Sequence, residues 1–231
     1  MIEQTIYALE ILADKQRAER SQAMFPTAMK IIGVRAPNIK KVAAECWVEV
    51  NNQSPEKLLA FAKTLVNTKI LECNQLAFEL LWKNKKALQL VRLKDIEELG
   101  INIDNWVTVD TLSIMISGWA WRERQITNKD VLNWLKSNNR WWRRTAVVST
   151  VPLNLRSRGG TGDALRTLLV CEKVVDDRDD MIVKALSWAL RELSKSDKAA
   201  VEEFMDKYDA RLSGRVRREV YNKLETGRKN G

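Results

Sequence analysis

A carboxylate and an indole are spaced to lie together near the middle of the chain, in the segment Asn105-Trp106-Val107-Thr108-Val109-Asp110. On a helix of 3.6 residues per turn, Trp106 and Asp110 share one face on neighbouring turns. No Lys or Arg stands three or four residues from Asp110 on either side. Such a carboxylate can direct its charge at a group from outside the helix, so we take this pair as the candidate active centre. An Asp on a helix can equally bond a backbone group or a distant Arg.

Two later segments break their own helical patterns. In residues 140–148, Arg144 falls inside the apolar stripe of the expected helix, whereas Arg143 lies on the opposite face. An Arg in that position either pairs with an acid or reaches an anion such as phosphate at the edge of the packed face. In residues 179–194, Trp188 lies opposite the core face, flanked by Lys184 and Arg191. A large aromatic side chain on a polar face costs solvation unless something covers it.

A third basic group surrounds an expected helix start at Pro37. Arg35 precedes the start, and Lys40 and Lys41 lie in the first turns. Cations in the first turn oppose the helix dipole, so a nearby phosphate would relieve an unfavourable arrangement. A solvated basic turn is the alternative.

Composition sets limits on fold, partners and chemistry. The chain has 231 residues, only four Pro and nine Gly, and a net charge of +9. Long stretches of helix-forming residues predict an all-α protein, and the charge favours a polyanionic partner such as nucleic acid. There is no His, hence no imidazole base and no His-ligated metal. We expect Cys46, Cys73 and Cys171, which are odd in number and far apart, to be buried, reduced thiols rather than zinc ligands.

We expect about twelve helices, arranged in pairs that are joined by short loops. The first, over residues 2–20, is predicted to be a packing helix. Corresponding positions recur at Arg35, Glu72, Asp110, Arg144 and Trp188, a period of about 40 residues that is typical of HEAT-like repeats. We therefore predict one HEAT-like solenoid domain over residues 1–224 with a concave basic face, followed by a frayed tail over 225–231. No signal peptide or membrane span is evident, which favours a cytoplasmic location.

The segments that carry these residues resemble a known family. Asn105-Trp106-x-x-x-Asp110, Trp141-Trp142-Arg143-Arg144-Thr145-Ala146 and Lys184-Ala185-Leu186-Ser187-Trp188-Ala189-Leu190-Arg191-Glu192 are similar to those of the AlkD-type alkylpurine DNA glycosylases. Gly33-Val34-Arg35-x-Pro37 and the closing Arg217-Arg218 helix are similar as well.

The resemblance implies a HEAT-like solenoid that holds duplex DNA and removes cationic N3- or N7-alkylated purines. It implies that Asp110 is the catalytic carboxylate, that Trp106 and Trp188 face the lesion, and that Arg144 contacts the DNA backbone. The neighbouring cations are expected to bind the backbone too: Arg143, Lys184, Arg191, Arg35, Lys40 and Lys41. We expect no cofactor and no metal, no membrane partner, and a monomer that works on the bacterial nucleoid.

Two other functions use the same fold. A non-catalytic HEAT-like protein that binds damaged or branched DNA needs the basic face but no carboxylate at position 110. A protein-interaction scaffold, the commonest use of helical solenoids, predicts an acidic or apolar concave surface instead of these cations. The sequence does not separate N3-methyladenine from N7-methylguanine or from bulkier adducts.

Overall fold

The structure is a computed structural model that describes residues 1–50 and 52–230. Within these residues all regular secondary structure is helical and no strand forms. Lys30 and Ile70 make one isolated parallel β-bridge. The predicted all-α class with a helical repeat is confirmed. The chain divides into two compact units, Met1–Ile116 and Ser117–Gly231. Each is described separately, and the single domain over residues 1–224 stays a prediction.

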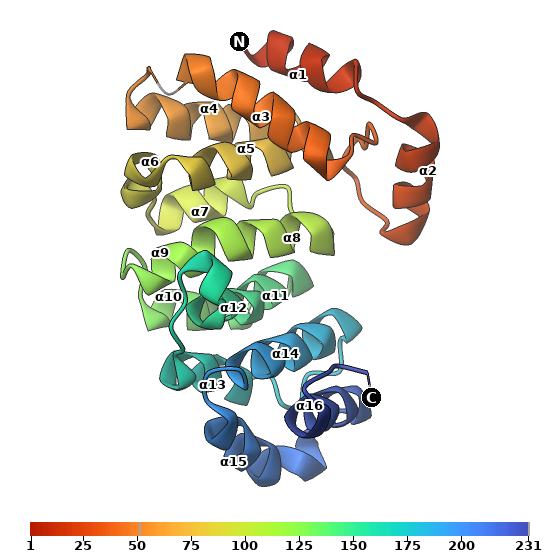
Figure 1. Cartoon of the computed structure of the whole chain (residues 1–231), viewed down its shortest axis with the longest axis vertical. Coiled ribbons are helices and arrows are strands. Elements are labelled where there is room, and N and C mark those ends of the chain that lie inside the picture. Colours follow the sequence, from red (N-terminus) through yellow and green to blue (C-terminus); the bar gives the residue numbers. More distant parts are fainter. Residues whose placement is uncertain (51, 231) are drawn as a thin grey trace. The chain divides into compact units, whose positions relative to one another are not determined.

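The first unit contains eight labelled α-helices among its described residues (Figure 1). They are α1 (Ile2–Glu10), α2 (Lys15–Met24), α3 (Ala36–Val50), α4 (Pro55–Asn67), α5 (Leu71–Lys83), α6 (Lys85–Leu90), α7 (Leu93–Leu99) and α8 (Trp106–Leu112).

Helix α5 is the centre of the first unit. It packs against α3, α4 and α8, and its residues Leu76, Phe78 and Leu80 have no exposed surface. Helix α4 begins where Ser54 and Pro55 predict, since the Ser54 hydroxyl accepts a hydrogen bond from the Lys57 N–H. The Trp106 helix and the basic segment before α3 are thus both placed by contact with the same buried helix.

The single packing helix predicted over residues 2–20 is wrong. The chain leaves α1 at Glu10 and starts α2 at Lys15, with the Asp14 side chain accepting from the Arg17 N–H as the N-cap. The Asp14 N–H donates to the Ile32 carbonyl, so a contact between distant residues interrupts the local pattern. Leu9 is buried in α1, but α2 buries none of its residues.

A π-helix at Ser113–Ser117 follows α8, and the helical stretch continues to Arg122. The helices of the second unit among the described residues are α9 (Gly118–Arg122), α10 (Asn128–Leu135), α11 (Arg140–Val148), α12 (Val151–Asn154), α13 (Ala164–Glu172), α14 (Asp180–Leu193), α15 (Lys198–Tyr208) and α16 (Gly214–Thr226), with short 3₁₀ turns at Arg156–Arg158 and Asp209–Arg211. Helix α14 is central here, packed by α11, α13 and α16. Figure 1 shows α16 beside α14.

The C-terminal helix extends past the predicted start of the tail. Helix α16 runs to Thr226, two residues into the predicted tail, and Gly231, the last residue of that tail, lies outside the described residues. None of the helices in the described part of the chain combines the length and the apolar composition that crossing a membrane requires.

The junction between α2 and α3 is a close backbone contact at Gly33. This residue has a φ of +86°, and a Cβ there would lie 2.1 Å from the Asp14 carbonyl oxygen. Only glycine avoids both the strained backbone region and the overlap. The segment that carries Arg35 is therefore held against the start of α2.

Gly33→Ala should destabilise the protein by at least about 2 kcal/mol, because positive-φ strain and a clash with backbone atoms coincide. Urea denaturation followed by circular dichroism measures the loss. Gly227→Ala is the matched control, since Gly227 has a φ of +74° but no atom within 4 Å of the added Cβ. Equal losses in the two variants would contradict the close contact.

Candidate functional site

The predicted carboxylate and indole lie together on α8. Asn105 is the N-cap, its side-chain oxygen accepting from the Thr108 N–H at 3.0 Å. Trp106 is the first residue of the helix and is 37% exposed, and Asp110 follows one turn later and is half-buried. Trp106 and Asp110 therefore occupy neighbouring turns of the same helix.

The start of α8 is tied to the loop that follows α2. The Asp104 carboxylate accepts hydrogen bonds from the Thr27 hydroxyl and from the Ala28 N–H. The Asn105 side-chain amide donates to the Thr27 hydroxyl at 3.2 Å. Phe25, in the same loop, meets Trp106 edge to face, with ring centroids 5.7 Å apart. The Trp106 indole is thus positioned by residues about 80 positions earlier in the chain.

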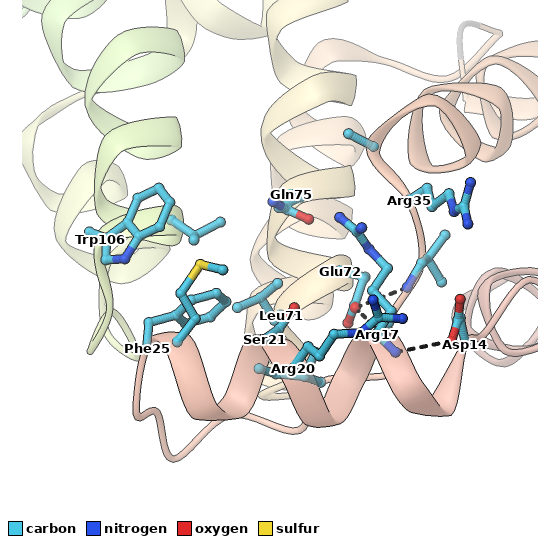
Figure 2. Close-up of a pocket in the computed structure, with 16 residues that line it drawn as sticks. Asp14, Arg17, Arg20, Ser21, Phe25, Arg35, Leu71, Glu72, Gln75 and Trp106 are labelled. Carbon is cyan, nitrogen blue, oxygen red and sulfur yellow. Dashed lines mark hydrogen bonds between the residues drawn. The ribbon is translucent and has the colours of Figure 1, made fainter.

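A pocket of about 460 Å³ opens beside Trp106 within the first unit. Figure 2 shows Trp106 and Phe25 at one end and Arg35 at the other, with Arg17 and Arg20 of α2 between them. Its apolar end continues into a small buried cluster of Phe25, Met29 and Leu71. The pocket combines an aromatic end with a cationic end.

The wall of this pocket depends on one buried carboxylate. Glu72 on α5 is 1% exposed and accepts three backbone hydrogen bonds, from Ile32 at 3.1 Å, Gly33 at 2.7 Å and Val34 at 3.3 Å. Three donors compensate the loss of water that an ionised carboxylate suffers on burial. Glu72 therefore has a structural role that its place in the 40-residue period did not reveal.

Arg35, Lys40 and Lys41 are exposed, as the sequence suggested. Within residues 1–50 and 52–230, no ion pair involves any of the three. Their charge is carried at the surface of the first unit, where an anion can approach.

Trp188 lies half-buried on α14 in the second unit, but its flanking cations are engaged. Lys184 pairs with Asp180 at 2.6 Å, one turn earlier on the same helix. The Arg191 Nε donates to the Ser187 hydroxyl at 3.1 Å, and its guanidinium lies 3.9 Å from Glu219 of α16. Burial lowers the pKa of Arg191, against the opposing effects of Glu219 and Glu192.

Arg143 and Arg144 both hold the start of α14. Arg144 is only 5% exposed and donates to the Met181 carbonyl at 2.5 Å. The Arg143 guanidinium pairs with Asp177 at 3.3 Å and with Asp179 at 3.9 Å. Arg143, which the sequence placed on the face of the helix opposite Arg144, is thus held in structural salt bridges.

Burial governs the chemistry of the three cysteines. Burial raises the pKa of Cys73 to about 11 and raises those of Cys171 and Cys46 as well, so the thiols stay protonated at neutral pH. Cys73 and Cys171 are buried, as expected, whereas Cys46 is half-buried. In residues 1–50 and 52–230, no three Cys, Asp or Glu side chains cluster as metal ligands would.

The sequence analysis missed Arg17, Arg20 and Phe25. A signal was present, since Arg17, Arg20, Ser21 and Met24 follow the i, i+3, i+4, i+7 spacing of one helix face. That face is mostly polar, so periodicity of apolar residues could not find it.

The comparisons with known proteins agree with this fold. The chain matches the family model described as DNA alkylation repair enzyme over residues 5–224. A solved structure described as a predicted DNA alkylation repair enzyme from Enterococcus faecalis is similar, with a TM-score of 0.72 and 19% sequence identity, covering 92% of this chain and 97% of that chain. A search of curated proteins gives no significant match.

The fold and the composition together define a class of protein: a helical-repeat protein with a surplus of basic residues. Because the family model covers nearly the whole sequence, the chain belongs to the DNA alkylation repair enzyme family. Its role therefore lies in DNA repair. The similarity to the Enterococcus faecalis structure, at 19% identity, supports the fold.

The ionic network around Glu219, which joins α14 to α16, gives a pH-dependent prediction. Burial by itself would raise the pKa of Glu219, but the Ser187 hydroxyl, Lys229 and Arg191 together hold it below its usual value. A depressed carboxyl pKa contributes stability above the usual pKa of 4.5, and this contribution is lost as the pH falls through the lowered value. Glu219→Gln should therefore be less stable than the wild type near neutral pH, and the difference should shrink in acid.

Thermal unfolding across a pH series measures this difference. Glu225→Gln, an exposed position on the same helix, is the control and should follow the wild type throughout. A Glu219→Gln deficit that stays constant from neutral to acid pH would mean that the charge of Glu219 is not what stabilises the network.

Proposed function

We propose that this protein is a monofunctional DNA glycosylase that hydrolyses the N-glycosidic bond of cationic N3- or N7-alkylated purines in duplex DNA. It acts as a monomer without a metal or cofactor. Asp110 is the catalytic carboxylate, and Trp106 and Trp188 face the lesion nucleotide. The observation that carries the proposal is the pair of Trp106 and Asp110 on neighbouring turns of α8, within a chain of the DNA alkylation repair family.

The chemistry needs no general acid. Alkylation at N3 or N7 makes the purine cationic, so it leaves as a neutral base, taking the electron pair of the bond to C1′ of the sugar. Positive charge develops on the sugar as that bond breaks. The carboxylate of Asp110 stabilises the oxocarbenium-like sugar and orients a water molecule, which adds to C1′ and loses a proton. A chain without histidine can therefore support this reaction.

The aromatic residues supply selectivity for charge. A cationic base over an indole ring gains about 1 to 2 kcal/mol when the contact is desolvated, whereas a neutral base gains little. The exposed face of Trp106 suits this contact, and Phe25 supports the ring from the side. Selectivity then follows the charge of the lesion more than the shape of a tight pocket.

The basic residues proposed to bind DNA fall into two groups, those that are exposed without an ion pair in the described part of the chain and those that already have partners in the protein. Arg35, Lys40 and Lys41 are exposed and are the best-supported backbone contacts of the predicted set. Lys184, Arg143 and Arg191 are proposed to bind phosphate in exchange for, or in addition to, their present acidic partners. Arg144 is proposed to contact the backbone while also bonding Met181.

Asp110→Asn should lower the rate of base release from methylated duplex DNA by at least about 100-fold, because the amide does not stabilise a developing positive charge. Binding of the same DNA should change little. Released 3- or 7-methylpurine is measured by chromatography after single-turnover incubation.

Asp206→Asn, an exposed carboxylate on α15, is the matched control and should retain full release. Unchanged release by Asp110→Asn would remove the proposed role of this carboxylate. If the wild type released no base but bound the DNA, the chain would instead be a non-catalytic protein that binds damaged or branched DNA.

A further inference from the structure

We propose that the pocket beside Trp106 binds a backbone phosphate of the damaged DNA strand through Arg17, Arg20 and Arg35. The phosphate belongs to the nucleotide at Trp106 or to its neighbour. The inference rests on the proposed function only in taking Trp106 as the side chain that faces the lesion.

Helix α2 presents cations where helices usually present apolar residues. Arg17, Arg20, Ser21 and Met24 share one face and line the pocket. No residue of α2 is buried, so the helix gains little from apolar packing. The structure thus places the polar face of α2, with its two arginines, along the pocket.

The three guanidiniums have their charge available. In the described part of the chain, none of Arg17, Arg20 and Arg35 belongs to an ion pair, and all three side chains are exposed. Arg20 donates only to the Gln16 carbonyl. Guanidinium groups bind phosphate oxygens in a bidentate manner, which makes three of them around one cavity a phosphate site.

The two acids in the pocket wall are already engaged. The Asp14 carboxylate accepts from the Arg17 N–H as the cap of α2. The Glu72 carboxylate is buried beneath three backbone N–H donors. Neither acid pairs with the guanidiniums, so the positive charge of the cavity is not neutralised from within.

The opposite end of the pocket fits the rest of a nucleotide. Trp106 and Phe25 offer an aromatic wall at one end, and Arg35 stands at the other (Figure 2). The volume of about 460 Å³ lies in the range of ligand-binding clefts. An aromatic wall next to guanidiniums matches a sugar and base joined to a phosphate.

The test compares Arg17→Gln/Arg20→Gln with the wild type in binding a methylated duplex over a range of salt concentrations. Each lost phosphate contact lowers the slope of log K against log salt by about 0.9. The double variant should lose about one to two units of slope and bind at least about 10-fold more weakly at low salt. Because neither Arg17 nor Arg20 is buried, the melting temperature of the double variant should match that of the wild type.

Lys83→Gln/Lys86→Gln is the matched control. It removes two exposed cations from the same unit at positions that do not line the pocket, so it reports the effect of net charge alone. A slope loss in the arginine variant no greater than in this control overturns the proposal.

Base release measured on the same DNA separates this inference from the proposed function. If the wild type releases base but the arginine variant binds like the lysine control, the glycosylase stands and the phosphate site fails. If no protein releases base but the arginine variant alone loses slope, the phosphate site stands and the glycosylase fails.

Discussion

The buried carboxylate of Glu72 is the constraint on which the first unit depends. A carboxyl group with 1% exposure needs hydrogen-bond partners for its oxygens, and Ile32, Gly33 and Val34 supply three N–H donors. These bonds fix the segment between α2 and α3 on the central helix α5. Helix α2 buries nothing of its own, so it takes its place from that segment, where Gly33 passes over the Asp14 carbonyl. The position of the pocket follows from this one interaction.

The cations that line the pocket and those near Trp188 differ in whether they have acidic partners. In the second unit, the cations near Trp188 meet acids, as Lys184 does with Asp180 and Arg191 with Glu219. These pairs orient α14 and leave less net charge at its surface. In the first unit, the arginines of the pocket and the basic start of α3 point to solvent. A polyanion gains most where protein charge has not been compensated in advance, which favours the arginines of the pocket over the paired cations near Trp188 as phosphate contacts.

The reaction best suited to this chain is one in which the leaving group is already activated by the positive charge of the alkylated base. There is no histidine, and burial holds the thiols protonated. A cationic base needs neither a general acid nor a metal to depart, and it is attracted to an indole face. In the proposed mechanism, the Asp110 carboxylate supplies the stabilisation that the sugar requires. Membership of the DNA alkylation repair enzyme family gives the chain a role in DNA repair.

Interactions within a few residues were readable from the sequence. The all-α class, the starts of α4 and α8 at Ser54 and Asn105, and the adjacency of Trp106 and Asp110 all depend on neighbours one turn away. The tertiary structure decided what depends on distant residues. The break before α2 comes from the Ile32 carbonyl, and Arg143 finds its acid 34 positions later in the chain. The pocket arises in the same way, because four segments separated in sequence supply its wall, and no local pattern encodes which segments will meet.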